Sequence, residues 1–200
     1  LPAATSTLTP VATSTVTPVP PTDAPTHTSD SGRWEAVKQI EVNHPTTTAG
    51  FINDAFGITA GPNGEVHYTI DGGKSWPSAN NASLCRFGLD IVDERVAWTC
   101  GNPGHVRVTT DGGRNWQAVA DFGSWEPDHC RFLSFLDSMT GWAATRDQLT
   151  ATQDGGKSWT SLVLPPGIQK ITAIALRTAS EGYVLDSGAN LFVTQDGGRT

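Results

Sequence analysis

Residues 69–76 read Thr-Ile-Asp-Gly-Gly-Lys-Ser-Trp, and the same pattern returns three times further along the chain. The later copies are Thr109–Trp116, Thr152–Trp159 and Thr194–Thr200, and the last copy stops one position before its expected tryptophan. Successive aspartates of the pattern are 40, 43 and 42 residues apart. A period of about 40–45 residues is typical of an array in which each unit is one four-stranded propeller blade.

Each copy, which we call a box, contains an Asp-Gly-Gly turn between two strands. Glycine adopts a positive φ without a steric penalty, and tight hairpin turns need that conformation. The aspartate can accept hydrogen bonds from its own turn, and the threonine two residues earlier can add its hydroxyl. The tryptophan is expected to bury its ring against adjoining strands and to pin the hairpin to its blade core. We therefore assign a structural role to Asp71, Gly73, Trp76, Asp111, Gly113, Trp116, Asp154, Gly156, Trp159, Asp196 and Gly198.

Calcium binding is the functional alternative for the box turns. An EF-hand loop needs oxygen ligands at alternate positions and a distal glutamate, whereas each box offers one carboxylate followed by Lys or Arg. The histidines do not cluster, and we expect His67 and His105 to be surface residues. We therefore expect no metal and no cofactor.

The segments between the boxes read as short strands. Apolar residues alternate at Leu89 and Ile91 and at Leu133 and Phe135, and no useful helical periodicity appears. The expected first strands are 47–52, 84–92, 131–136 and 171–176, and the expected third strands are 65–70, 105–110, 148–153 and 190–195. Gly-aromatic segments form the second strands, and fourth strands begin at the box tryptophans. The prediction is an all-β propeller of antiparallel four-stranded blades, with three complete units, a fourth lacking its outer strand, and a truncated ring or open arc.

The first residues of the chain differ in composition from the rest. Residues 1–32 are rich in Thr and Pro, and we expect a disordered stalk there, followed by the propeller from residue 33 to 200. Such a stalk is common between an export signal or lipid anchor and an extracellular domain, so we expect a secreted or cell-surface protein with a signal or anchor upstream. The formal net charge is −7 without a basic cluster, which argues against nucleic acid, and no apolar run is long enough to span a membrane.

The three cysteines, Cys85, Cys100 and Cys130, are too few for a disulfide scaffold and lack metal-ligand spacing. Buried thiols are one interpretation, and a bridge between two of the three is the other.

The pattern Thr-x-Asp-Gly-Gly-(Lys/Arg)-x-Trp resembles the Asp-box, or BNR repeat, of sialidase-like β-propellers. Together with segments such as Gly141-Trp142-Ala143, the chain from about Arg33 to Thr200 is most similar to the propellers of photosystem II stability/assembly factors and their bacterial relatives. The resemblance indicates the fold strongly. It leaves the activity open, because Asp-box propellers include hydrolases, receptors and assembly factors.

In such propellers ligands usually meet the face opposite the box turns. The long connection 121–129 is expected on that face, with Arg86 and Arg131 near its mouth. The residues that we expect to bind a partner are Arg86, Arg131, Trp125, Glu126, Asp128 and His129. The alternative interpretation is that the loop packs its tryptophan over a blade seam and that the two arginines form internal salt bridges.

No catalytic signature appears in the sequence. The Tyr nucleophile of a sialidase has no match, since Tyr68 and Tyr183 align with core or structural positions of other units, and the Arg-Ile-Pro motif typical of sialidases is absent. We therefore expect no catalytic residues and a non-enzymatic interaction module with a protein or peptide partner, or else a glycan. The alternative is a sialidase-like or glucan-acting glycoside hydrolase whose catalytic residues lie in blades outside this sequence.

Overall fold

A computed structural model describes residues 48–61, 64–82, 88–101, 105–121 and 130–199. The predicted stalk and the start of the predicted propeller domain lie outside these residues, so the boundary at residue 33 stays a prediction. No helix in the described part of the chain is long and apolar enough to cross a membrane.

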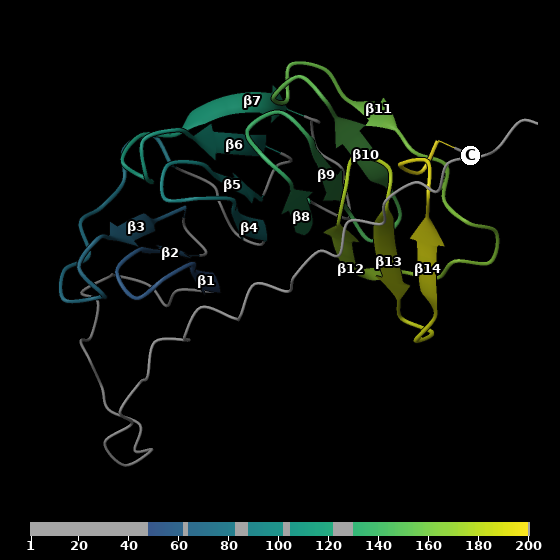
Figure 1. Cartoon of the computed structure of the whole chain (residues 1–200), viewed down its shortest axis with the longest axis horizontal. Helices are drawn as coiled ribbons and strands as arrows, with labels where there is room; N and C mark the ends of the chain where they lie inside the picture. Colours follow the sequence, from purple (N-terminus) through teal and green to yellow (C-terminus); the bar gives the residue numbers. More distant parts are fainter. Residues whose placement is uncertain (1–47, 62–63, 83–87, 102–104, 122–129, 200) are drawn as a thin grey trace, which may run out of the picture. The chain divides into compact units, whose positions relative to one another are not determined.

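The described residues form four antiparallel sheets, which follow one another along the chain (Figure 1). The first sheet contains β1 (Thr48–Phe51), β2 (Gly57–Ala60) and β3 (Val66–Thr69). The second contains β4 (Gly88–Ile91), β5 (Ala97–Cys100), β6 (His105–Thr109) and β7 (Gln117–Asp121). The third contains β8 (Phe132–Phe135), β9 (Gly141–Ala144), β10 (Leu149–Thr152) and β11 (Thr160–Ser161). The fourth contains β12 (Ile171–Leu176), β13 (Gly182–Asp186) and β14 (Leu191–Thr194). The predicted all-β class and the blade-like sheets are confirmed.

The first sheet has three strands, although the sequence predicted four. Its outer segment makes only a single antiparallel bridge, between His67 and Ser78. Proline at position 77 has no N–H to donate, so a ladder cannot continue at that residue. The chain then leaves the sheet, because the N–H of Asn80 donates to the carbonyl of Arg114 in the next unit (2.8 Å). His67, expected at the surface, is buried.

Neighbouring sheets are joined at their first strands, because β1 contacts β4, β4 contacts β8, and β8 contacts β12. Side chains on β4 and β8 support two of these contacts. Asp90 Oδ2 accepts the N–H of Phe135 (2.5 Å), and Ser134 Oγ accepts the N–H of Leu176 (2.8 Å). Burial raises the pKa of the Asp90 carboxyl, against the opposing effect of the Phe135 N–H.

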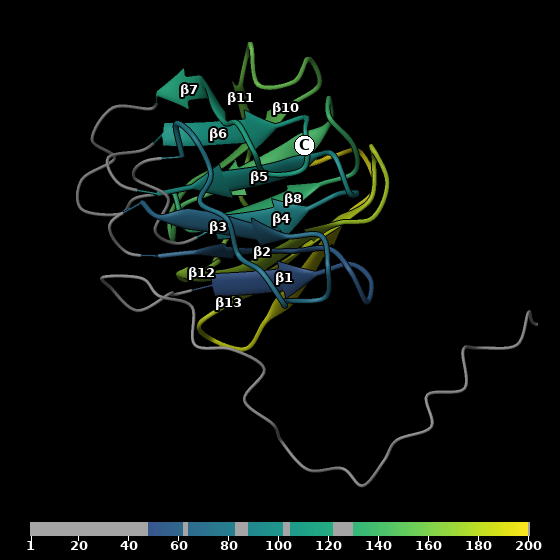
Figure 2. The same ribbon diagram turned by 90° about the vertical axis from the view of Figure 1, so that its left-hand side faces the viewer.

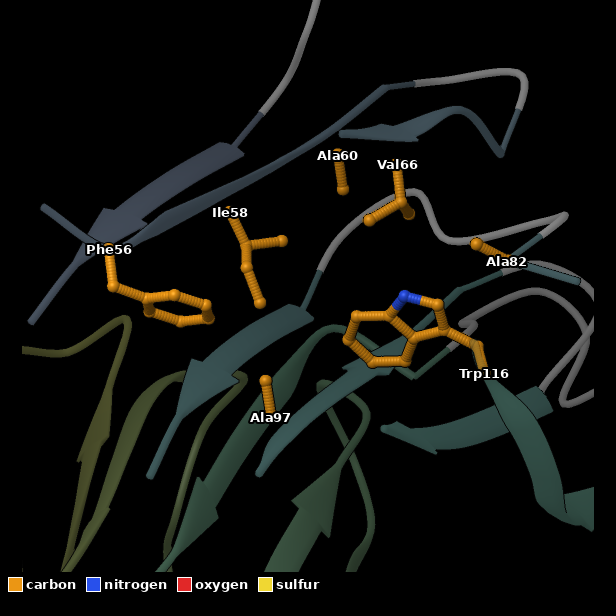
Figure 3. Packing of buried hydrophobic residues seen from close by; sticks show 7 residues of the cluster. All are labelled: Phe56, Ile58, Ala60, Val66, Ala82, Ala97 and Trp116. Carbon is orange, nitrogen blue, oxygen red and sulfur yellow. The ribbon is translucent and has the colours of Figure 1, made fainter. Parts of the chain in front are cut away.

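Buried side chains fill the seams between successive sheets. In the first seam, Trp116 lies in one buried cluster with Phe56, Ile58 and Val66, which all come from the preceding unit (Figure 3). Trp159 likewise packs on the cluster around Trp98, one unit earlier in the chain. Each of these tryptophans therefore ties its hairpin to the preceding sheet, whereas the sequence predicts that the ring pins the hairpin to the core of its own blade.

The second seam is the most aromatic part of the described core. Trp98 is fully buried, and its ring stacks on Phe135 with centroids 3.9 Å apart. Trp159 meets the edge of the same phenyl ring at 6.3 Å. Offset-stacked and edge-to-face pairs add about 0.5–1.5 kcal/mol each beyond the burial of apolar area. The seam between the second and third sheets is therefore a strong junction.

Two box tryptophans that differ in burial should contribute differently to the stability of the protein. Trp116 is 2% exposed, whereas Trp76 is half-buried and meets Phe51 edge-on. Replacing Trp116 with Ala is expected to cost about 3–5 kcal/mol of unfolding free energy, because it empties a packed seam. Urea denaturation should show a clearly smaller loss for the matched Trp76→Ala variant. Equal losses would contradict the packing of Trp116 between the sheets.

Candidate functional site

The strands place two kinds of turn at opposite ends of the sheets. The box turns lie at one end, together with the turns between first and second strands. In every unit the first box glycine donates its N–H to a carbonyl of that neighbouring turn, as Gly72 does to Ala55 (2.9 Å) and Gly155 to Met139 (3.0 Å). We call this the box end; β1, β4 and β6 point toward it in Figure 2. The other end, the loop end, carries the turns between second and third strands and the connections between sheets.

The first box turn is closed by its own side chains. Thr69 Oγ1 donates to Asp71 Oδ1 (2.8 Å) and accepts the N–H of Gly73 (2.9 Å). Asp71 also accepts the N–H of Ser75 (2.9 Å) and its hydroxyl (2.6 Å). Gly72 and Gly73 have φ values of 72° and 84°, which the turn needs and which side chains disfavour.

The same network recurs in the later boxes. Asn115 takes the place of Ser75 around Asp111, and Ser158 takes it around Asp154. In the fourth box the carboxylate of Asp196 accepts the hydroxyl of Thr194 (2.7 Å) and the N–H of Arg199 (3.1 Å).

These hydrogen bonds stabilise the charged carboxylates. Those from Ser75 and Thr69 lower the pKa of Asp71 to about 2, and those from Ser158 and Thr152 lower the pKa of Asp154 to about 2. At Asp111 burial raises the pKa, but the hydrogen bonds from Asn115 and Thr109 outweigh it, and the net pKa is lowered. Among the described residues no group of three or more His, Cys, Asp or Glu side chains could hold a metal ion. The box carboxylates are therefore occupied by their own turns.

The loop end carries a cleft of about 380 Å³ at the third and fourth sheets. Its walls are Asp147, Leu164, Ile168, Gln169, Lys170 and Ser187. Lys170 and Asp147 pair across it at 2.5 Å, with both side chains about half exposed. An exposed pair of this kind contributes about 0–1 kcal/mol, so a ligand can replace it at little cost.

Asp186 holds the far wall of this cleft in place. Its buried carboxylate accepts the N–H groups of Gln169 (3.0 Å), Gly188 (2.8 Å) and Asn190 (2.9 Å). The hydrogen bond from Gln169 leads the effects that lower the pKa of Asp186. The carboxylate therefore fixes the β13–β14 turn against the connection that precedes β12.

Arg131 lies at the loop end, immediately before β8. Its side chain is half-buried. The backbone N–H of Arg131 donates to the carbonyl of Ala144 at the end of β9 (2.8 Å). The other residues expected to bind a partner, Arg86, Trp125, Glu126, Asp128 and His129, lie outside the described residues. Their assignment, with that of Arg131, stays a prediction.

Lys170, which lines the cleft, and Asp186, which holds Gln169 of its wall, were not among the residues expected to bind a partner. The spacing Asp186-Ser187-Gly188-Ala189-Asn190 is a turn signal that could have identified the carboxylate as a turn acceptor. Nothing in the sequence pairs Lys170 with Asp147, because the pairing depends on how two loops from adjacent sheets meet.

A disulfide joins Cys100, at the end of β5, to Cys130, just before β8. The two Cα atoms are 5.7 Å apart, and the residues are separated by 30 positions. The sequence left open whether the cysteines are buried thiols or whether two of them form a disulfide, and the structure contains the disulfide. Cys85 lies outside the described residues. The bridge adds a covalent link between the second and third sheets at the loop end, one residue from Arg131.

Consecutive antiparallel sheets, each closed by a Thr-x-Asp-Gly-Gly turn, define an Asp-box β-propeller. A family model described as photosynthesis system II assembly factor YCF48 matches residues 26–163, and the chain belongs to this family. No curated protein matches the sequence closely enough to count as a relative.

Solved structures show the same fold at low sequence identity. One described as YCF48 bound to D1 peptide is 18% identical, with a TM-score of 0.55 and 82% of each chain covered. YCF48 from Cyanidioschyzon merolae is 19% identical with a TM-score of 0.57, and the match covers 81% of this chain and 57% of that one. The computationally designed Ika4 protein is 13% identical with a TM-score of 0.60, and the match covers 82% of this chain and all of that one. At these identities the structures support the fold alone.

The box carboxylates predict how stability depends on pH. Folding lowers the pKa of Asp71 and Asp154 from 3.8 to about 2, so the folded state holds these protons less tightly than the unfolded state. The stabilisation is complete above about pH 4 and should be lost as the pH falls toward 2. The free energy of unfolding, followed by urea titration at several pH values, should fall less over this range in the Asp71→Asn/Asp154→Asn variant. An identical slope in both proteins would contradict the role of these carboxylates.

The disulfide predicts the number of free thiols and the loss of stability when the two cysteines are replaced. Alkylation of the unfolded, unreduced protein should label one of the three cysteines, Cys85. Replacing Cys100 and Cys130 with Ser should lower the free energy of unfolding by about 3–4 kcal/mol, because the loop of the unfolded chain is no longer closed. Cys85→Ser serves as the matched control and should change stability by less. Labelling of all three cysteines would contradict the bridge.

Proposed function

We propose that this chain is a non-enzymatic, assembly-factor-like propeller that binds a peptide segment of a protein partner at its loop end. The observation that carries the proposal is its membership of the YCF48 assembly factor family. A structure with the same fold is described as YCF48 bound to D1 peptide, which makes a peptide the first ligand class to test here.

The geometry of the two ends supports the loop end as the binding face. At the box end the carboxylates are already bound by their own turns, as for Asp71 and Asp154. The loop end offers a cleft, a replaceable Lys170–Asp147 pair and the arginine at position 131. A guanidinium forms paired hydrogen bonds with a carboxylate, so we propose that Arg131 binds a carboxylate of the peptide. The residues proposed as further contacts are Arg86, Trp125, Glu126, Asp128 and His129.

We also propose that the protein acts outside the cytoplasm, as a secreted or cell-surface protein. The Cys100–Cys130 disulfide supports this location, because disulfides persist in oxidising compartments and are rare in the cytosol. The Thr/Pro-rich composition of residues 1–32 is also in keeping with an exported protein.

The binding proposal predicts a selective loss in the Arg131→Ala variant. The probe is an array of synthetic peptides with free carboxylates, each paired with its amidated form. Peptides that bind should require the carboxylate, and Arg131→Ala should weaken them about tenfold or more, because a hydrogen bond to a charged group is lost. Lys157→Ala, which removes a positive charge from an exposed box-end residue, should leave binding unchanged.

Two outcomes would contradict the proposed function. One is peptide binding that responds equally to Arg131→Ala and Lys157→Ala, with thermal unfolding showing that both variants are folded. The other is hydrolysis of a sialoside or a β-glucan by the purified chain, which would favour the glycoside hydrolase instead.

A further inference from the structure

The loop-end cleft at the third and fourth sheets has room for a small ligand. Its volume is about 380 Å³, at the lower end of the range of about 300–1,000 Å³ that is usual for small-ligand sites. Leu164 and Ile168 give it two apolar side chains, and both also pack against the buried cluster that contains Trp142. Lys170 and Asp147 give it one charge of each sign. The cleft therefore combines an apolar patch with two opposite charges.

The wall that carries Ile168 is a tight turn. Residues 165–168 read Pro-Pro-Gly-Ile, and the N–H of Ile168 donates to the carbonyl of Pro165 (3.3 Å). Gly167 has a φ of 81°. Proline at the second position and glycine with a positive φ at the third are typical of a type II turn. Because the proline ring fixes its own φ, this wall is ordered before a ligand arrives.

Hydrogen bonds to two other turns hold the main chain at Lys170. Its carbonyl accepts the N–H of Ser187, in the β13–β14 turn (2.8 Å). The N–H of the next residue, Ile171, donates to the carbonyl of Arg146, in the β9–β10 turn (2.7 Å). The base of the lysine side chain is therefore fixed relative to both sheets that form the cleft.

Asp147, on the opposite side, lies in a turn that is closed by Thr145. The hydroxyl oxygen of Thr145 accepts the N–H groups of Asp147 (3.1 Å) and Gln148 (3.0 Å). The N–H of Thr145 donates to the carbonyl of Gln148 (3.0 Å). A site whose walls are already ordered loses little conformational entropy when a ligand binds, and the three turns of this cleft meet that condition.

The ion pair across the cleft favours a ligand that carries both charges. A ligand with one charge replaces the Lys170–Asp147 pair by a single new pair, whereas a ligand with both charges replaces it by two. Because Nζ of Lys170 and Oδ2 of Asp147 are 2.5 Å apart, the two charges of the ligand must also lie close together. A free α-amino acid carries its ammonium and its carboxylate on one carbon atom. In a dipeptide a peptide unit separates the two charges.

We propose that the loop-end cleft binds a free α-amino acid with an apolar side chain. The carboxylate of the ligand pairs with Lys170, and its ammonium pairs with Asp147. Its side chain lies on Leu164 and Ile168. The inference goes beyond the peptide binding proposed above, because the ligand is a small molecule and Arg131 takes no part in holding it.

The test is a calorimetric titration of the full chain with L-leucine. A dissociation constant of about 1 mM is expected, because ion pairs at half-exposed side chains are weak. N-acetyl-L-leucine lacks the ammonium and L-leucinamide lacks the carboxylate, so each should bind about fivefold more weakly. Glycine should also bind about fivefold more weakly, because it has no side chain to bury. The proposal is overturned if L-leucine does not bind at about 10 mM, or if N-acetyl-L-leucine binds equally well.

Variants of the ion pair locate the site. Lys170→Met and Asp147→Asn each remove one charge and keep most of the side chain, and each should weaken L-leucine about fivefold. Both side chains are about half exposed, so neither variant is expected to unfold. Lys170→Arg keeps the charge and should keep the affinity within about twofold. Lys157→Met removes a charge from an exposed box-end residue and should change nothing, and an effect equal to that of Lys170→Met overturns the site.

The amino acid site and the peptide site can fail separately. Arg131→Ala should leave the affinity for L-leucine unchanged, because the ligand is held by other side chains. A chain that binds L-leucine and none of the carboxylate peptides supports the cleft and contradicts the proposed peptide binding. Peptide binding that depends on Arg131, without any binding of L-leucine, contradicts the cleft alone.

Discussion

One threonine hydroxyl in each box holds the turn on which the sheets depend. It donates to the box aspartate and accepts the N–H of the second glycine, as Thr109 does with Asp111 and Gly113. The second glycine then presents its carbonyl to the indole N–H of the box tryptophan. A local hydrogen bond thus becomes a contact between sheets, because the tryptophan it positions lies in the seam with the preceding unit. Hydrogen bonds of this kind contribute about 0.5–1.5 kcal/mol each, whereas the buried ring contributes several times more.

The hydrogen-bonded box turns make the two ends of the sheets differ in what they can bind. At the box end the polar groups form hydrogen bonds with one another, and those from Ser75 and Thr69 lower the pKa of Asp71 because they stabilise its charge. The loop end is built from connections of unequal length, and the Cys100–Cys130 bridge and the Asp186 network hold two of them. A rigid scaffold with variable loops at one end is a common basis for recognition. This division is the reason why we propose the loop end for partner binding.

Much of the fold could be predicted from the sequence, because strand positions depend on local pattern. The predicted strand 171–176 is observed as β12, and the box period placed every third strand within one residue of its observed bounds. The prediction failed in the first sheet, where Pro77 lacks the donor that Gln117 provides at the equivalent position. It also placed His67 at the surface, because burial on a short strand depends on what covers it. The binding role of the loop end stays a prediction, and the sequence did not point to the pairing of Lys170 with Asp147 in the cleft there.

The sequence by itself determined the repeat, the turn chemistry and the family, because each depends on short motifs and on their spacing along the chain. Glycines at positive φ and a threonine two residues before the aspartate leave little choice of turn. The tertiary structure alone decided where the tryptophans lie, which cysteines pair, and which loops form clefts. Those outcomes depend on the register between neighbouring sheets, which joins residues about 30 to 50 positions apart, such as Cys100 with Cys130 and Asp90 with Phe135. No local pattern carries that information, because it arises only when one sheet packs on the next.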